Sequence, residues 1–490
     1  MKLKLSESSV AGRLMMMIGL LVAFPVIVLP FYPDEIGYLS DFLIPGGGSV
    51  LLGLLICLFG SHDSADSAGW RSSTQRSSIT VLFAWLWGVL IGALPFVFSG
   101  QLRMVQALFE AVSGWTTTGL SAMDVSITPM VFLFHRSFMQ YCGGLGFIMV
   151  MTVFISNKNS MNLFSAEGHP DKLMPNLKKT TQAIFVIYNA CLVVGTIAYR
   201  IVGMSWFDGV CHAMCSLSTG GFSTKLGSIG EYDSLPIEII TIVLMIIGTT
   251  NFAALLLLVK GKFRAFSRVS EIRFMCLVLL VAIPVVAWSL SSGLGVSLPE
   301  GLRLASFDIV SAMSTTGYSS MSYADWPQLA LGVMIVTMLI GGGIGSTAGG
   351  LKLSRVYLMF RMAGINIKRR LSPPNGIESP HYIKPQGKTP IDHDLQDDIV
   401  GFITTYLSIF FVGSLLITVT ADCTLTEAMF DFASSMGTVG LSMGITSPLT
   451  NDATLIIEMI GMLLGRLEIF IVLIALTSLP RFIRSRFHNH

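Results

Sequence analysis

Residues 430–440 read Phe-Asp-Phe-Ala-Ser-Ser-Met-Gly-Thr-Val-Gly, and three further segments of the 490-residue chain, 109–119, 210–220 and 307–317, repeat the pattern. In every copy a hydroxyl residue stands two positions before a glycine. The copy at 430–440 ends in Thr-Val-Gly, the core of the potassium-channel filter signature. Four glycine-centred loops at similar spacing in one chain predict a ring built around an ion.

Composition places these loops in a membrane. Charged residues make up only 12% of the chain and the mean hydropathy is +0.70, whereas a soluble domain carries about 25% charged residues. We therefore expect an integral membrane protein surrounded by a lipid bilayer. The net charge of +2 carries no information about nucleic acid, and we expect no nucleic-acid partner; the seven scattered cysteines favour plain packing over a metal site.

Hydropathy predicts an all-α membrane protein of about ten transmembrane helices, in which two leading helices precede four pseudo-repeats around one pore. Each repeat consists of a spanning helix, a short pore helix with its filter loop, and a second spanning helix. The expected divisions are the leading pair at 1–78, pore repeats at 79–160, 161–260, 261–370 and 399–490, and a cytoplasmic linker at 371–398.

The segment between the paired helices, for example 101–118, is too short to cross a bilayer and has to enter it and return. Irregular backbone at that depth is tolerated only where it lines a cavity. Glycine allows successive carbonyls to face one side, and threonine and serine add hydroxyl oxygens. The predicted potassium-binding filter residues are Thr117, Thr118, Gly119, Ser218, Thr219, Gly220, Thr315, Thr316, Gly317, Thr438, Val439 and Gly440.

One polar position recurs within the pore helices. Glu110, Asp308 and Asp431 stand nine residues before their glycines, and Cys211 takes this place in the second copy. These side chains could tune the field behind the filter or anchor the pore helix by hydrogen bonds, and we favour anchoring.

Most of the 31 basic residues belong to loops between units or to the termini, and only four lie on the motif side: Arg103, Arg200, Lys225 and Arg303. The positive-inside rule therefore predicts that both termini are cytoplasmic and that the filters open outward. Acidic residues gather on the outward side, where they would concentrate cations, although the same bias would leave them there by default.

The second helices contain glycines near their middle, at Gly143-Gly144, Gly248, Gly341 and Gly465. The third break is too rich in glycine for a stable helix, so we expect a loop in the cavity below the filter that acts as a gate. Arg466 could be a fixed charge that slows cations or a donor that holds this loop, while Glu468 faces elsewhere. Arg136 is expected to snorkel to the outer surface. The predicted gate residues are Gly341, Gly342, Gly343, Gly345, Ser346, Thr347, Gly349, Gly350, Lys352 and Arg466.

Three motifs carry a family resemblance: Ser-Thr-Gly-Gly-Phe-Ser-Thr at 218–224, Gly-Ser-Thr-Ala-Gly-Gly-Leu-Lys at 345–352 and Gly-Arg-Leu-Glu-Ile-Phe at 465–470. With these motifs the chain resembles the Trk/Ktr superfamily of potassium transport membrane subunits over about residues 80–480, and its leading helices fit the Trk branch. The fourth filter, 437–444, looks closer to the Ktr branch.

The resemblance implies potassium uptake across a bacterial inner membrane by a homodimer with one pore per subunit. It also implies a gating loop at 341–350, Arg466 at the constriction, and a Trk-A-like cytoplasmic ring of nucleotide-binding regulatory subunits. Potassium is the one ion expected, and no organic cofactor is expected.

Two other classes of function are open to a membrane chain of this kind. The alternative is a secondary transporter that couples potassium to sodium or protons, as in Ktr-like symport. A transporter that couples another solute to these ions would have inverted repeats and a solute site at the middle of the membrane. Four repeats that run in the same direction disfavour that second class. The sequence offers no nucleophile elbow, phosphate loop or His-rich metal set, so we do not expect an enzyme.

Overall fold

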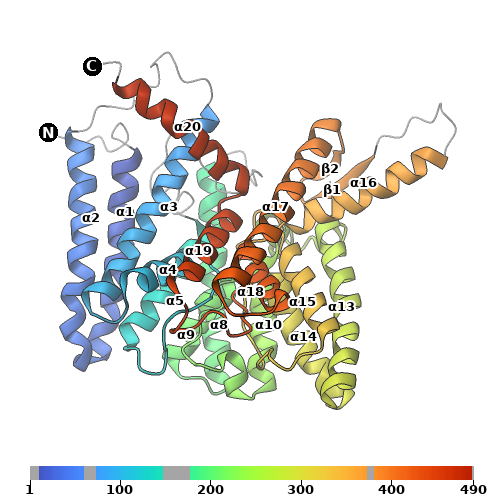
Figure 1. The fold of residues 1–490 in the computed structure, drawn as a ribbon, viewed down its shortest axis with the longest axis horizontal. Helices are drawn as coiled ribbons and strands as arrows, with labels where there is room; N and C mark the ends of the chain where they lie inside the picture. The colour runs from blue at the N-terminus through green and yellow to red at the C-terminus, as the bar shows by residue number, and fades with distance from the viewer. Residues whose placement is uncertain (1–9, 60–72, 147–176, 372–379, 488–490) are drawn as a thin grey trace.

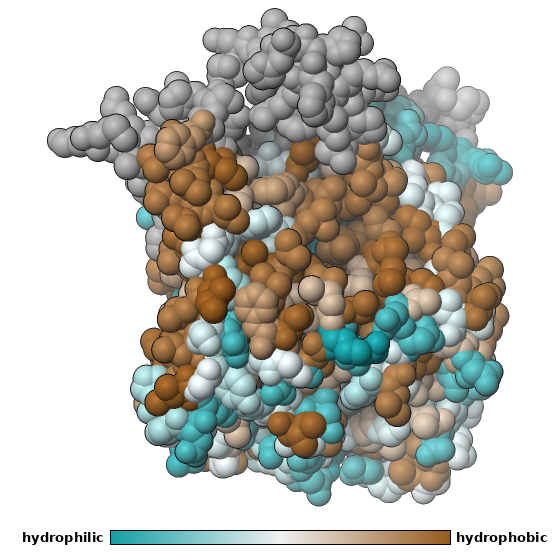
Figure 2. Space-filling view, turned by 60° about the vertical axis from the view of Figure 1, so that its left-hand side comes forward, coloured by the Kyte–Doolittle hydropathy of each residue, from teal (hydrophilic) through white to brown (hydrophobic). Residues whose placement is uncertain are grey.

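The computed structural model describes residues 10–59, 73–146, 177–371 and 380–487. Within these ranges the chain is helical except for one two-stranded antiparallel hairpin. In the described part of the chain, six helices are long and apolar enough to cross a membrane, or eight if each of two bent pairs counts as one span. Apolar surface spreads over the middle of the face in Figure 2, and polar residues collect toward its lower edge. The protein is therefore a multi-pass, all-helical membrane protein, as predicted.

The leading pair consists of α1 (Val10–Ala23) and α2 (Leu39–Phe59), joined by the 3-10 helices η1 (Phe24–Phe31) and η2 (Pro33–Tyr38). The second leading helix begins at Leu39, three residues before Phe42. A helix that began near Phe42 would already be long enough to cross the membrane. The two helices stand side by side at the left of Figure 1. They can pack closely because four positions at their contact lack a side chain: Gly12, Gly19, Gly46 and Gly53. A Cβ atom at any of these glycines would overlap the backbone of the opposite helix.

Four units follow, each with a first helix, a pore helix and a second helix. The first helices are α3 (Ser73–Phe98), α8 (Leu177–Ile201), α13 (Ser270–Leu294) and α17 (His393–Thr420). The pore helices are α4 (Met104–Trp115), α9 (Trp206–Leu217), α14 (Leu298–Ser314) and α18 (Leu425–Gly437). The second helices are α5 (Met130–Leu145), α10 (Leu235–Thr249) with α11 (Phe252–Val259), α15 (Gln328–Ile340) with α16 (Leu353–Leu371), and α19 (Asp452–Arg466) with α20 (Ile469–Phe487).

The second helix of each unit packs on the pore helix of the next. Thus α5 contacts α9, α10 contacts α14, α15 contacts α18, and α19 closes the cycle on α4. A pore helix of 12 residues such as α4 is about 18 Å long, well short of the roughly 30 Å bilayer core. The four pore helices therefore enter the membrane partway and lie together in the lower half of Figure 1.

The predicted breaks are present in the second helices of units two, three and four, whereas in unit one Gly143 and Gly144 lie within α5 near its end. The axis turns by 113° between α10 and α11 and by 104° between α19 and α20. Cβ atoms at Gly143, Gly248 and Gly465 would overlap carbonyl oxygens at the ends of their own pore helices, on Trp115, Leu217 and Met436. These glycines thus let each second helix pass directly beneath its pore helix. In the third unit the glycine segment separates α15 from α16, and the predicted extension of α5 to Ile155 lies outside the described residues.

The region expected to be an unstructured linker differs from the prediction in part. Strands β1 (His381–Lys384) and β2 (Gly387–Pro390) form the hairpin, and α17 begins at His393. Tyr382 is buried, and the amide of Ile383 donates to Ser270 Oγ at the start of α13. This packing against α13 is a tertiary contact, which explains why the local composition, rich in proline and glycine, did not indicate a strand. The rest of the expected linker, 372–379, lies outside the described residues. Two short helices, η3 (Ser228–Tyr232) and α12 (Phe263–Phe266), complete the fold.

Candidate pore and gate

The four motif loops share one unusual backbone conformation. Thr117, Thr219, Thr315 and Thr438 have φ of 55°, 53°, 58° and 51°, a left-handed conformation that is rare for β-branched residues. Two residues after each lies a glycine with positive φ: Gly119 (99°), Gly221 (73°), Gly317 (82°) and Gly440 (103°). Alternation between left-handed and ordinary residues turns successive carbonyls to the same face of the loop, as a cation filter requires.

The backbone hydrogen bonds correct the alignment of the second copy by one residue. The amides of Thr118, Thr316 and Val439 donate to carbonyls five residues earlier, at 2.9, 3.0 and 2.8 Å, and Gly220 makes the same bond to Cys215 at 2.8 Å. Thr219-Gly220-Gly221 therefore corresponds to Thr117-Thr118-Gly119. Ser218 lies one position before the loop that the sequence pattern assigned to it, because both Gly220 and Gly221 satisfy that pattern.

The loops meet in a closed ring. A Cβ added to Gly119 would overlap the carbonyl oxygen of Gly220, and one on Gly221 would overlap that of Thr316. The same relation joins Gly317 to the Val439 carbonyl, and Gly440 to the Thr118 carbonyl. Each glycine therefore faces the next unit, and the four segments, although far apart in sequence, surround one axis.

The threonine hydroxyls line the inner side of this ring, and all four side chains are buried. Thr219 Oγ1 lies 3.1 Å from Thr347 Oγ1, and Thr315 Oγ1 accepts from the Gly349 amide at 2.9 Å. Among the described residues, the buried hydroxyls of Thr117 and Thr438 have no hydrogen-bond partner. Carbonyl and hydroxyl oxygens without a carboxylate are the ligands that suit a dehydrated monovalent cation.

The recurring polar position anchors the outer part of each loop. Glu110 accepts from Ser121 Oγ at 2.7 Å and from the Ala122 amide at 2.6 Å. Asp308 accepts from Ser320 and Tyr323, and Asp431 from Ser442 and Met443.

With the corrected alignment, the fourth member of this set is His212, not Cys211. Its Nε2 lies 3.0 Å from Ser223 Oγ, in the loop beyond the second filter. The prediction of an anchoring role therefore agrees with the contacts in all four units.

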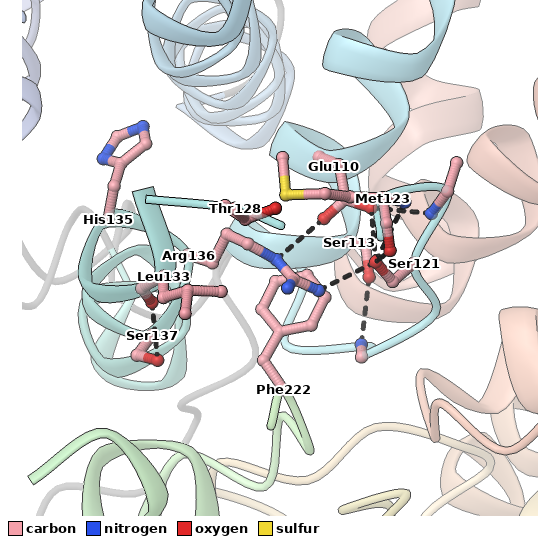
Figure 3. Close-up of polar contacts among 12 residues, drawn as sticks. Glu110, Ser113, Ser121, Met123, Thr128, Leu133, His135, Arg136, Ser137 and Phe222 are labelled. Carbon is pink, nitrogen blue, oxygen red and sulfur yellow. Dashed lines mark hydrogen bonds and ion pairs between the residues drawn. The ribbon is translucent and has the colours of Figure 1, made fainter. Parts of the chain in front are cut away.

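Arg136 does not snorkel, contrary to the sequence prediction. Its side chain is 2% exposed, and Nε lies 2.9 Å from Glu110 Oε2. Another guanidinium nitrogen donates to Ser121 Oγ at 2.8 Å, and the guanidinium lies 3.9 Å from the centroid of the Phe222 ring (Figure 3). Arg136 thus links the first filter loop to the second. The sequence signal was the buried acid at Glu110, which requires a partner within the apolar region.

The glycine-rich segment, 341–352, lies directly beneath the filter. The Gly343 amide donates to Thr249 O at 3.0 Å, where α10 ends, and Thr347 Oγ1 lies 3.0 Å from Leu217 O and 2.9 Å from Gly248 O. The Lys352 ammonium donates to Ala348 O within the segment itself. A Cβ on Gly349 would overlap Thr438 Oγ1. The loop therefore touches the threonines of units two, three and four.

Arg466 holds this loop from the far side. One guanidinium nitrogen donates to Thr347 O at 2.7 Å, and the other donates to Gly143 O at 2.6 Å and Gly144 O at 3.2 Å. Glu468 faces away, as predicted, and pairs with Arg355 at the start of α16 at 2.7 Å. The predicted gate residues are thus brought together around the carbonyls below the filter.

A multi-pass protein in which four unlike pore loops enclose one axis, with an intramembrane loop beneath them, is a membrane cation-transport protein of the pore-loop class. The family model described as TrkH, a cation transport protein, matches residues 54–481, and the chain belongs to this family.

Curated relatives agree over most of the chain. The Trk system potassium uptake protein TrkH of Halomonas elongata is 29% identical over 97% of this chain and 98% of its own length. TrkH of Escherichia coli K12 is 31% identical over 85% and 87%. The crystal structure of the potassium transporter TrkH from Vibrio parahaemolyticus superimposes with a TM-score of 0.82 at 26% identity, over 96% of this chain and 97% of that one.

Proposed function

We propose that this chain takes up potassium through the ring of four filter loops, under the control of the glycine-rich loop beneath them. The named relatives are potassium uptake proteins. The single observation that carries the proposal is the ring itself. In it, each filter glycine lies against the carbonyl oxygen of the residue that precedes the corresponding glycine in the next unit. Its buried, unpartnered hydroxyls at Thr117 and Thr438 are suited to an ion on the axis.

The gate follows from the contacts below the ring. Thr347 and Gly349 fill the space under the threonines, and Arg466 fixes Thr347 through its carbonyl oxygen. Potassium passes only when this segment moves aside. Since the loop is tied mainly by hydrogen bonds and carries few side chains, a modest displacement of α16 or α19 opens the path.

The remaining features rest on the resemblance. The chain works in a bacterial inner membrane with cytoplasmic termini, as a homodimer with a Trk-A-like nucleotide-binding ring on the cytoplasmic side. The basic last turn of α16, with Lys368, Arg369 and Arg370, supports this orientation. Cross-linking of the purified complex would test the assembly.

Substitution of Gly440 tests the filter. Gly440→Ser places a Cβ against the Thr118 carbonyl at a φ of 103°, so we expect the preference for potassium over sodium to fall about tenfold, the effect of about 1.4 kcal/mol. Isotope flux into liposomes that contain the purified protein gives the permeability ratio. The matched control is Gly332→Ser on α15, where an added Cβ meets no atom within 4 Å. An unchanged ratio in Gly440→Ser would remove the filter assignment.

Coupling to a second ion, the Ktr-like alternative, is tested in the same liposomes. A pore that conducts passively gives potassium flux that follows the potassium gradient and the voltage alone. Potassium uptake driven by an imposed proton or sodium gradient at zero voltage would instead establish symport.

A further inference from the structure

Each filter loop has one residue between its left-handed threonine and its positive-φ glycine, and in the second loop this residue, Gly220, has no side chain. The equivalent residues in the other units are Thr118, Thr316 and Val439, all fully buried. Gly220 does not have the positive φ that would demand glycine. Backbone geometry therefore does not explain its identity, and the reason has to be its neighbours.

The neighbour is Gln140, on α5 of the preceding unit. A Cβ on Gly220 would overlap the Cδ and Oε1 atoms of Gln140, so the amide occupies the space that a filter side chain fills elsewhere. Gln140 is fully buried. Its Nε2 donates to Gly220 O at 2.5 Å, and its Oε1 accepts from the Phe222 amide at 3.1 Å. Only this orientation of the amide satisfies both bonds, because Phe222 N can only donate and Gly220 O can only accept.

The other units pair these two positions differently. Gln140 stands three residues before the break glycine Gly143. The residues three before Gly248, Gly341 and Gly465 are Met245, Met338 and Met462, each fully buried. By position in the sequence, three units thus have a methionine before the break glycine where the next filter has a threonine or valine, and one has a glutamine where the next filter has a glycine.

We propose that Gln140 is a selectivity-positioning residue: its amide replaces the missing side chain of the second filter loop and fixes the Gly220 carbonyl. This inference rests on the proposed filter. The Gly220 carbonyl also faces Gly119 in the ring, so its direction affects two of the four loops. Arg136, one helical turn before Gln140 on α5, lies over the Phe222 ring, so both side chains contact the same loop segment, 220–222.

The test exchanges the two arrangements. Gln140→Met removes both hydrogen bonds from buried backbone groups, and we expect about a tenfold loss of potassium over sodium preference and a raised KM for potassium with little change in maximal rate. Gly220→Thr alone overlaps Gln140 and lowers the folded yield. The double variant Gln140→Met/Gly220→Thr introduces the methionine and threonine found at these positions for two of the other filter loops, and we expect it to recover folding and to bring selectivity back toward the wild-type value.

A near-isosteric change covers the case in which Gln140→Met folds poorly. Gln140→Leu has nearly the same volume and can neither accept from the Phe222 amide nor donate to Gly220 O, so we expect selectivity to fall. Val243→Ala, at an exposed position on α10, is the control for effects of purification and reconstitution on the measured flux. Folded yield is followed by size-exclusion chromatography, and selectivity and KM by liposome flux.

Two results would overturn the proposal: wild-type selectivity and KM in Gln140→Leu, or a double variant that folds and selects no better than Gly220→Thr. Gly440→Ser measured in parallel separates the two levels of inference. If Gly440→Ser changes selectivity and the Gln140 variants do not, the filter stands and the role of Gln140 falls. If neither changes selectivity, the filter assignment itself is wrong.

Discussion

The Glu110–Arg136 pair is a buried salt bridge inside the apolar part of the molecule, with side chains 0% and 2% exposed. Such a pair contributes little net stability compared with apolar residues, but removal of one partner leaves a buried charge and costs about 3–5 kcal/mol. We therefore expect Arg136→Met to lower the thermal stability of the purified protein strongly in detergent. The double variant Glu110→Gln/Arg136→Met should recover much of the loss, because the introduced amide oxygen still accepts from the Ala122 amide. If the double variant instead loses as much stability as the sum of the losses in Arg136→Met and Glu110→Gln alone, the pairing is contradicted.

Substitutions of the single residue Arg466 distinguish two mechanisms for the gate: a hydrogen-bonded tether and a fixed positive charge. The guanidinium binds three backbone carbonyls on two segments, Thr347 on one and Gly143 with Gly144 on the other. Arg466→Ala should raise basal potassium flux in either mechanism. Arg466→Lys keeps the charge but cannot bridge these carbonyls with a planar fork. If the tether closes the pore, the lysine variant leaks; if the fixed charge is the barrier, it stays closed. Liposome flux without any partner subunit makes the distinction.

At the scale of elements, the leading pair packs on α3 and α5, and one of its links to the pore is a cap at the start of α5. Glu35 in η2 accepts from the amides of Met130 and Val131 at 2.7 and 2.9 Å, and so caps α5 from 95 residues away in sequence. A lost cap costs about 0.5–2 kcal/mol, so Glu35→Ala should lower the melting temperature moderately. Since α5 contacts the second filter loop through Arg136 and Gln140, which lie further along the helix than the capped end, selectivity should not change. A change in the potassium-to-sodium ratio would show that the leading pair also sets the filter.

The sequence predicted elements that repeat and missed contacts between elements. The breaks in the second helices of units two, three and four were predictable because hydropathy and helix-breaking residues are local, and the break predicted at Gly248 occurs within a few residues, at Thr250 and Asn251. The one-residue shift at Ser218 was not predictable, because two adjacent glycines fit one pattern and only a backbone hydrogen bond distinguishes them. Likewise, the partner of Arg136 lies on another helix, and neither residue's local sequence shows the pairing.

At the scale of the whole molecule, the cyclic packing makes the filter a property of all four units together. Every second helix supports the pore helix of the next unit, and α19 returns to α4. The buried apolar core forms two main clusters, one largely from the leading pair with units one and two, the other from units three and four. The ring of filter loops lies where these clusters meet, so an ion bound there links both halves of the fold.

Potassium should therefore stabilise the entire protein and not only its loops. A ligand that binds the folded state alone adds RT ln(1 + [L]/Kd), about 2.7 kcal/mol at a hundredfold excess over Kd. We expect a higher melting temperature in potassium than in sodium at equal ionic strength, with N-methylglucamine as the baseline. Gly440→Ser should lose this difference because its added Cβ meets the Thr118 carbonyl, while Gly332→Ser, exposed on α15, should retain it. Equal shifts for the two ions in the wild type, or a potassium shift that survives in Gly440→Ser, would mean that the ion binds elsewhere than in the ring.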